Sequence, residues 1–418
     1  MKICAIISEY NPFHYGHLKH ITDAKRQSGA DAIMIILSGN FTQRGEPCIL
    51  NKYVRARIAL EAGADIVVQM PTAYSTSTAE IFALAGVKIA NSFENVTHLA
   101  FGVETKHPEL LQELAKFLVE EPKAYKTKLK KYLNDGNSLV VSRQKAIEEL
   151  IKNDEVSFSE ITEITNILKQ PNNILAIEYL KALIKTNSKI IPVFTTRGES
   201  EYNSEEVVGK NSSATAIRAK LYKTNRVHSI KKLVPKFSYS LLKEEIKTFG
   251  LPDTSLFNNL CMYALKVSTT EELKKLFDVT EGLENRFHEV SKTTKDLNDF
   301  LLQVKTKRYT FTRIKRIVLG NLLKINAKTV QSIYDLDILP FIKVLAFKND
   351  REELLKSVSA NTNLIIRVNN VDNQPNSLYT ELANIEDRAN QIYNMLLRKT
   401  IVFLNTLLTY LQKVLNYN

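Results

Sequence analysis

The sequence predicts an α/β fold, in which a parallel sheet wrapped by helices is followed by a mainly α-helical C-terminal part. Up to about residue 200, apolar runs of strand length alternate with stretches of helical periodicity, an alternation typical of parallel sheets. From about residue 223 the strand pattern gives way to a series of helical patterns. We therefore expect two domains, residues 1–222 and residues 223–418.

Each expected element follows from its local pattern. Short aliphatic runs predict strands, and amphipathic stretches between cap and stop residues predict helices. Asn51, for example, is a good N-cap and Gly63 a stop signal for the helix between them. A short extended segment near residues 364–367 returns toward the core, without a defined place. The expected strands are 3–7, 32–37, 65–70, 98–101 and 189–194, and the expected helices are 18–28, 52–62, 78–92, 109–118, 239–247, 256–266, 270–276, 284–291, 297–303, 313–323 and 386–417.

Composition restricts the class of protein. The chain has 418 residues, of which 44% are hydrophobic and 24% charged, as in a globular protein. Its net charge of +12 suggests a polyanionic partner. Three cysteines form no C-x-x-C pattern, so we expect reduced thiols and a cytoplasmic location. No apolar stretch has the 18 or more residues of a membrane span, so we expect no membrane association.

A histidine motif, His14-Tyr15-Gly16-His17, lies between the first expected strand and the first helix. Pro12 fixes the turn before it, and Gly16 lets a ligand approach the backbone. A helix N-terminus attracts anions, and two imidazoles there suit a phosphate whose charge grows during a reaction. The alternatives are a metal-binding pair or an exposed polar helix start. A metal would need a third ligand, and no cysteine or carboxylate stands nearby at a zinc-site spacing.

Three further polar segments accompany the expected strands and helices. In the loop 38–47, Arg44 could reach a phosphate or carboxylate, unless the loop is merely solvated. The pair Asn172-Asn173 is either a helix cap or a group that binds adenine or ribose. The segment 213–218 combines hydroxyls, helix N–H groups and Arg218, which could hold a triphosphate tail, although a capped surface helix has the same pattern.

These motifs carry a family resemblance. His14-Tyr15-Gly16-His17 and Ser213-Ala214-Thr215-Ala216-Ile217-Arg218 resemble the H-x-G-H and S-x-T-x-x-R signatures of the nucleotidyltransferase superfamily. Longer motifs at 9–14, 38–47, 171–175, 281–286 and 306–313 resemble the tRNA(Met) cytidine acetate ligase family, over most of the chain. The sequence departs from that family at Asn51 and Tyr53, where Asp and Trp are expected, and at Asn203-Ser204, where His-Asp is usual.

The resemblance implies a Rossmann-like nucleotidyltransferase fold and a two-step reaction. Acetate attacks the α-phosphorus of ATP, which gives acetyl-adenylate and pyrophosphate. The N4 amine of the wobble cytidine in elongator tRNA(Met) then takes the acetyl group, leaving N4-acetylcytidine and AMP. Acetate needs no base, so positioning and charge stabilisation are the main tasks, and His14 and His17 are the expected catalytic residues. We expect Mg²⁺ to bridge the phosphates and expect no metal site built by the protein alone.

The resemblance also implies a set of ATP-binding residues. They comprise the loop after the first strand and three isolated positions, while the S-x-T-x-x-R pattern adds three phosphate-binding residues. The full set is Ile7, Ser8, Glu9, Tyr10, Asn11, Pro12, Phe13, His14, Tyr15, Gly16, His17, Leu18, Lys19, His20, Gly102, Asn172 and Arg197, with Ser213, Thr215 and Arg218 for the phosphates.

A basic stretch, residues 305–316, interleaves cations with Tyr309 and Phe311. Such a mixture suits RNA phosphates together with a stacked unpaired base, although a solvated helix start with two core aromatics would look the same. The expected tRNA-binding residues are Lys305, Lys307, Arg308, Arg313 and Arg316.

Two other functions fit parts of the sequence. A nucleotidyltransferase that adenylylates a small cofactor precursor would share the histidine motif, but it is usually a single domain and does not need a basic helical half. A non-catalytic RNA- or nucleotide-binding module would not need an intact His14, Gly16 and His17. The sequence gives no indication of the oligomeric state.

Overall fold

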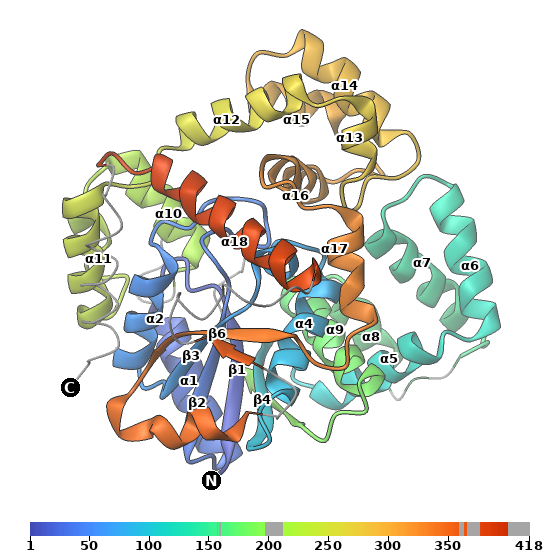
Figure 1. The fold of residues 1–418 in the computed structure, drawn as a ribbon. Helices are drawn as coiled ribbons and strands as arrows, with labels where there is room; N and C mark the ends of the chain where they lie inside the picture. The colour runs from blue at the N-terminus through green and yellow to red at the C-terminus, as the bar shows by residue number, and fades with distance from the viewer. Residues whose placement is uncertain (157, 159, 197–211, 359–362, 366–376, 400–418) are drawn as a thin grey trace.

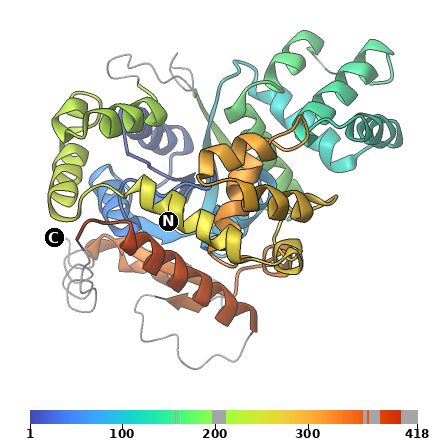
Figure 2. The ribbon, with the colours of Figure 1, turned by 90° about the horizontal axis from the view of Figure 1, so that it is seen from above.

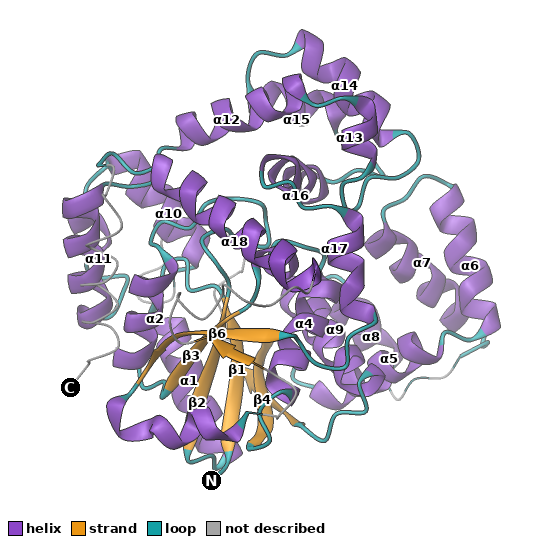
Figure 3. Ribbon diagram, in the orientation of Figure 1, coloured by secondary structure: helices purple, strands orange, loops and turns teal. Residues whose placement is uncertain are grey.

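The computed structural model describes the chain except for residues 157, 159, 197–211, 359–362, 366–376 and 400–418. Within the described residues, a seven-stranded sheet is covered by helices on both faces (Figures 1 and 3). The first five strands along the chain are mutually parallel, whereas β6 runs antiparallel to β3 and parallel to β7. In sheet order the strands are β5 (Ile191–Thr196), β4 (Val96–Val103), β1 (Ile3–Ser8), β2 (Ala32–Leu37), β3 (Ile66–Gln69), β6 (Phe341–Phe347) and β7 (Asn363–Ile365). The expected α/β fold with a parallel sheet is confirmed.

The central strands are apolar throughout because both of their faces are buried. In β1, Ile3 and Ala5 pack into one hydrophobic core, while Cys4 and Ile6 pack into the core on the opposite face. This alternation is the period of two of an extended strand, and burial on both faces removes the need for polar positions. The register pairs Ile6 with Ile35 of β2, so the two strands end side by side.

Helices pack against the two faces as two layers. Four of them share the core of Cys4 and Ile6, namely α1 (Tyr15–Ser28), α2 (Lys52–Glu61), α10 (Ala214–Thr224) and α11 (Lys236–Phe249). The other core includes α4 (Ala79–Asn91), α5 (Pro108–Glu120) and α9 (Pro171–Lys185), together with buried residues of most of the remaining helices. The remaining helices are α3 (Thr72–Ser75), α6 (Lys123–Asn134), α7 (Leu139–Lys152), α8 (Ile161–Ile167), α12 (Thr254–Val267), α13 (Thr270–Lys274), α14 (Leu283–Thr293), α15 (Leu297–Val304), α16 (Phe311–Leu322), α17 (Ala327–Gln331) and α18 (Ser377–Met395), with 3₁₀ turns η2 (Val227–Ile230), η3 (Ser332–Tyr334) and η4 (Asn349–Ser357). Within the described residues, no helix is long and apolar enough to cross a membrane.

The expected elements of both halves correspond to helices and strands of the structure, but several observed elements, such as α7 and α8, were not predicted. The sequence analysis did not predict β6, and it left β7 without a place, so the sheet takes two strands from the second half of the chain. The division at residue 222 stays a prediction. The expected helix 386–417 overlaps α18 as far as Met395, and its part beyond residue 399 lies outside the described residues, as does Asn203-Ser204.

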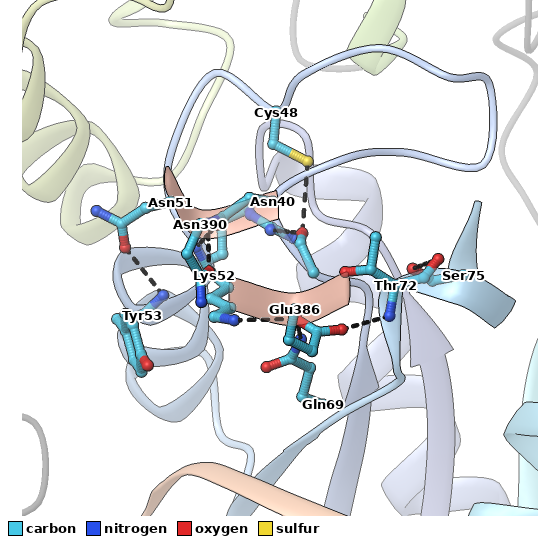
Figure 4. Close-up of polar contacts among 12 residues, drawn as sticks. Asn40, Cys48, Asn51, Lys52, Tyr53, Gln69, Thr72, Ser75, Glu386 and Asn390 are labelled. Carbon is cyan, nitrogen blue, oxygen red and sulfur yellow. Dashed lines mark hydrogen bonds and ion pairs between the residues drawn. The ribbon is translucent and has the colours of Figure 1, made fainter. Parts of the chain in front are cut away.

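The helices of the second half lie over the edge of the sheet at which the parallel strands end (Figures 1 and 2). One of them, α18, is attached there through Glu386 (Figure 4). Its carboxylate accepts hydrogen bonds from Gln69 Nε2 (2.5 Å) and from the backbone N–H of Thr72, and it pairs with Lys52 Nζ at 3.4 Å. Burial lowers the pKa of Lys52, whereas for Glu386 the nearby lysines and the Thr72 bond outweigh burial and lower the pKa. The buried cluster therefore joins the C-terminal helix to the first half of the chain.

Candidate active site

A cavity of about 210 Å³ lies at the carboxyl ends of the parallel strands, where ligands bind in such sheets. We refer to it as the first cavity. Its walls come from the loop after β1, the first turn of α1, the loop after β2, the ends of β4 and β5, and the N-terminal turns of α9 and α10. The lining residues are Ile7, Ser8, Glu9, Tyr10, Asn11, His14, Gly16, His17, Lys19, His20, Thr42, Gln43, Arg44, Phe82, Phe101, Gly102, Asn172, Leu175, Tyr179, Thr195, Thr196, Ser213, Ala214, Thr215 and Arg218.

The two histidines of the motif form a capping box at the start of α1. His14 Nδ1 accepts a hydrogen bond from Gly16 N (3.0 Å), and His17 Nδ1 accepts one from His14 N (3.2 Å). A ring nitrogen that accepts carries no proton, so in the neutral rings the proton is on Nε2 of both histidines. The rings stack with centroids 3.8 Å apart. The backbone therefore fixes both imidazoles with their N–H donors on the Nε2 side.

Gly16 is required by the position of His14. A Cβ at residue 16 would lie 2.9 Å from His14 Cε1 and 3.1 Å from His14 Nδ1, closer than side chains pack. Any other residue would push the ring from its capping position. Tyr10 and Phe13 support His17 from the other side, with ring centroids 4.9 and 5.5 Å from its imidazole.

The opposite wall is the start of α10, a second helix N-terminus. Ser213 is its N-cap, and its hydroxyl accepts from Ala216 N (3.1 Å). Arg218 donates through Nη1 to the carbonyl oxygen of Asn11 (2.8 Å) and through Nη2 to Thr215 Oγ1 (3.4 Å). The S-x-T-x-x-R segment is therefore a capped helix start, as predicted, and it lines the first cavity together with the histidine motif.

Asn11, which lines the first cavity, has a buried donor without a hydrogen-bond partner in the described part of the chain. Asn11 is 4% exposed, and its Oδ1 accepts from Ile49 N (2.9 Å). Its Nδ2 is buried and has no hydrogen-bond partner among the described residues. An unpaired buried donor is costly, so this amide N–H is suited to an anionic or carbonyl group of a ligand in the first cavity.

The loops after β1 and β2 are held by buried charged groups. Arg55 is fully buried on α2 and donates to the carbonyl oxygens of Leu50 (3.0 Å), Glu9 (2.6 Å) and Gly39. Glu9 Oε1 accepts from Gln43 N at 2.6 Å. Burial raises the pKa of Glu9, although the Gln43 bond and nearby guanidinium groups act in the opposite direction. Arg55 is a positioning residue that the sequence analysis missed, since α2 also carries Lys52 and Arg57 and nothing local marks Arg55 as the buried arginine.

The end of the first cavity near β4 is apolar and aromatic, with side chains such as Phe101 and Tyr179. Asn172 enters it from the first turn of α9, and its Nδ2 donates to Glu104 Oε1 (2.5 Å). The neighbouring Asn173 Oδ1 accepts from Glu104 N (2.9 Å). The interpretation of this pair as a helix cap is wrong, because α9 is preceded by Gln170 at the N-cap and both amides bind Glu104.

The predicted ATP-binding residues fall into three groups. Most of them line the first cavity, as do the three predicted phosphate-binding residues. Pro12, Phe13, Tyr15 and Leu18 do not line it, and Phe13 is buried beneath the motif. Arg197 lies outside the described residues. The lining residues that the prediction omitted are Thr42, Gln43, Phe82, Phe101, Leu175, Tyr179, Thr195, Thr196 and Ala214, together with Arg44, which the sequence analysis had noted only as a candidate.

The basic stretch is separate from this cavity, and most of its guanidinium groups are paired within the protein. Arg313 and Arg316 both contact Asp278, at 3.1 and 3.3 Å, and Arg308 pairs with Glu281. Lys305 and Lys307 are exposed. The RNA-binding role of all five residues stays a prediction.

No group of three or more His, Cys, Asp or Glu side chains in the described part of the chain could hold a metal ion. Among the first-cavity residues, Glu9 is the one carboxylate, and it is engaged with the Gln43 backbone.

Comparisons with known proteins agree with this architecture. A family model described as HIGH Nucleotidyl Transferase matches residues 1–403. Proteins described as tRNA(Met) cytidine acetate ligase are 36% identical in Alkaliphilus metalliredigens and 38% identical in Caldicellulosiruptor saccharolyticus, in both cases over 94% of this chain and 94% of the relative. The crystal structure of apo Thermotoga maritima TmcAL matches with a TM-score of 0.88 at 29% identity over 96% of each chain. The same protein bound with alpha-thio ATP matches with a TM-score of 0.85 at 29% identity over 95% of each chain.

Proposed function

This chain belongs to the HIGH nucleotidyl transferase family and, within it, to the tRNA(Met) cytidine acetate ligases, and from this premise we propose that it activates acetate with ATP and acetylates the wobble cytidine of elongator tRNA(Met). ATP is the first substrate, acetate the second and tRNA the third. The products are pyrophosphate, AMP and N4-acetylcytidine.

The observation that carries this proposal is the pair of helix N-termini that both line the first cavity. α1 brings His14 and His17, and α10 brings Ser213 and Arg218. Both helix ends attract anions, and the fixed Nε2–H groups and the guanidinium add donors suited to phosphate oxygens. A polyphosphate fits between them, with the base at the aromatic end near Phe101.

In the first step an acetate oxygen attacks the α-phosphorus, and the bond between this phosphorus and the bridging oxygen to the β-phosphate breaks. Negative charge grows on the departing pyrophosphate and on the α-phosphate oxygens. His14 and His17 stabilise that charge through Nε2–H donors whose orientation the capping box has already fixed, so little reorganisation is needed. No general base is required, because acetate is already ionised at neutral pH.

In the second step the cytidine N4 attacks the carbonyl carbon of acetyl-adenylate. A carbon–nitrogen bond forms, the bond from that carbon to the phosphate oxygen breaks, and N4 loses one proton. AMP leaves with the electron pair of the broken bond. Arg218, which lines the first cavity, is placed to stabilise the phosphate charge of this leaving group.

Mg²⁺ would enter on the phosphates and keep water ligands, because the first cavity offers it no free carboxylate pair. When bound, it neutralises phosphate charge. The net charge of +12 suits a tRNA partner, and an enzyme that modifies tRNA works in the cytoplasm.

The test is incubation of the protein with ATP, labelled acetate and bulk tRNA. We expect acetate-dependent AMP release, label in cytidine of tRNA, and acetate-dependent exchange of pyrophosphate into ATP without tRNA. Adenylate left on a small product would instead support a cofactor-precursor nucleotidyltransferase. Absence of both reactions, with ATP bound, would favour a non-catalytic module.

A further inference from the structure

We propose that a second cavity, of about 150 Å³ beside the first, holds the cytosine base that receives the acetyl group. The second cavity lies between α10, the loop after β2 and the helices α12, α15 and α16. Its lining includes Arg218, Tyr222, Phe257, Asn258, Leu301 and Lys315. This inference rests on the proposed function, because it assigns the place of that reaction's RNA substrate.

The two cavities are separated by one thin loop and share one side chain. Gln43 and Arg44 line the first cavity, whereas the next three residues, 45–47, line the second. The loop turns tightly here, with Gly45 N donating to Thr42 O at 3.0 Å. Arg218 lines both cavities. The guanidinium of Arg218 would therefore lie between a group bound in the second cavity and the phosphates of an adenylate bound in the first.

Gly45 keeps this partition thin. Its φ is +78°, and a Cβ at this position would lie 2.7 Å from the backbone oxygen of Lys315. The loop therefore packs backbone to backbone on α16, with no side chain between. This close contact leaves the volume beside it open for a ligand.

The walls of the second cavity have the chemistry of a nucleobase site. Phe257, Leu301 and Val318 are buried and give apolar surfaces on which a flat ring can stack. Around them stand the polar side chains of Asn258 and Asn298 and the ion pair of Glu46 with Lys315 (2.7 Å).

The polar groups match cytosine in particular. Its edge presents one donor, the N4 amine, and two acceptors, N3 and O2. A carboxylate such as Glu46 accepts from N4, as acidic side chains do in base recognition, while asparagine and lysine donate to N3 and O2. Tyr222 fixes the wall nearest α10, since its hydroxyl donates to Pro252 O at 3.3 Å.

The opening of the second cavity is accessible to a single-stranded loop. Asn298 is exposed and Asn258 half-buried, so the rim reaches solvent on the α12 and α15 side. Sequence-specific RNA recognition takes unpaired bases out of loops in this manner. The wobble base of an anticodon is such a base.

The experiment fills the second cavity and measures the two steps separately. Asn258→Trp places an indole in it, and Asn259→Trp is the matched control, because Asn259 is the adjacent, exposed residue on α12 and does not line the cavity. Acetate-dependent pyrophosphate exchange reports the first step, and single-turnover transfer from acetyl-adenylate to an anticodon stem-loop reports the second. We expect Asn258→Trp to keep exchange within about twofold and to slow transfer at least tenfold, with Asn259→Trp normal in both.

The outcomes distinguish a failure of the proposed function from a failure of the base-site inference. If the unaltered protein shows no acetate-dependent exchange, the proposed function fails. If it exchanges and transfers normally while Asn258→Trp also transfers at the normal rate, the second cavity is not the base site. If Asn258→Trp loses both steps, Asn258→Leu removes the amide without filling the space. Slower transfer with normal exchange in that variant supports the inference, and normal transfer overturns it.

Discussion

The first cavity and the basic stretch are both rich in hydrogen-bond donors and cations, but these groups have different contacts in the two regions. In the first cavity, the donors are fixed by backbone contacts, as with His14, His17 and Arg218. In the basic stretch, the guanidinium groups of Arg313 and Arg316 are paired with Asp278. A count of cations in a sequence therefore does not measure the charge available to a partner. The available charge depends on how many of the cations are paired within the protein and how many are left for a partner.

The largest expected effect concerns the capping box. His14→Asn and His17→Gln keep good capping residues but remove the imidazoles, so α1 should still form. We expect acetate-dependent pyrophosphate exchange to fall about 100-fold in each, since a preorganised charge stabiliser is lost. The thermal midpoint should change little. Near-normal exchange would assign the histidines to helix capping alone.

The next effect concerns the paired arginines. Arg316→Met removes a largely buried partner of Asp278 and should lower the free energy of unfolding by about 1–3 kcal/mol, measured in urea. Lys307→Met, at an exposed position of the same stretch, is the control and should stay within about 0.5 kcal/mol of the unaltered protein. Equal stability of the two variants would contradict the structural role of Arg316.

A smaller expected effect is a pH dependence of the free energy of unfolding, which comes from Glu245 on α11. Burial raises the pKa of Glu245 to about 7, although its bond with Asn51, the N-cap of α2, acts against this. The folded protein therefore holds a proton that the unfolded chain releases above the ordinary pKa of a glutamate, 4.5. Stability must then fall as the pH rises from about 4.5 to 7 and level off above.

Glu245→Gln should remove that fall and stabilise the protein by about 1–2 kcal/mol at pH 8, as measured by urea unfolding across pH 4.5–8. Glu244→Gln, at the exposed neighbouring position, removes a like charge that also raises this pKa, so it should move the fall only slightly to lower pH. Parallel curves for all three proteins would show that Glu245 does not titrate near neutrality.

The smallest expected effect is on RNA affinity. Lys307→Ala removes an exposed cation and should weaken binding of tRNA(Met) only severalfold, while the slope of log K against log salt decreases by about 1. Lys116→Ala, on α5, serves as the control. An unchanged slope for Lys307→Ala would move the RNA surface away from the basic stretch.

The predictions succeeded where the signal is local and failed where it depends on distant partners. The histidine motif could be interpreted from a strand, a turn and a helix start that are contiguous in the chain. β6 could not, because only its antiparallel pairing with β3, far back in the chain, makes it part of the sheet. The same holds for the binding of Asn172 and Asn173 to Glu104, and for the loops held by Arg55.

The pairing of β6 with β3 also bears on how the protein is made. The ribosome synthesises β1 to β5 long before it reaches Phe341. During that time β3 is an edge strand without its partner β6, and its unpaired backbone groups could bond to another nascent chain. Biosynthesis of this polypeptide is thus exposed to aggregation until about its last fifth emerges. The first half of the chain cannot be excised as a free-standing module without leaving that edge open.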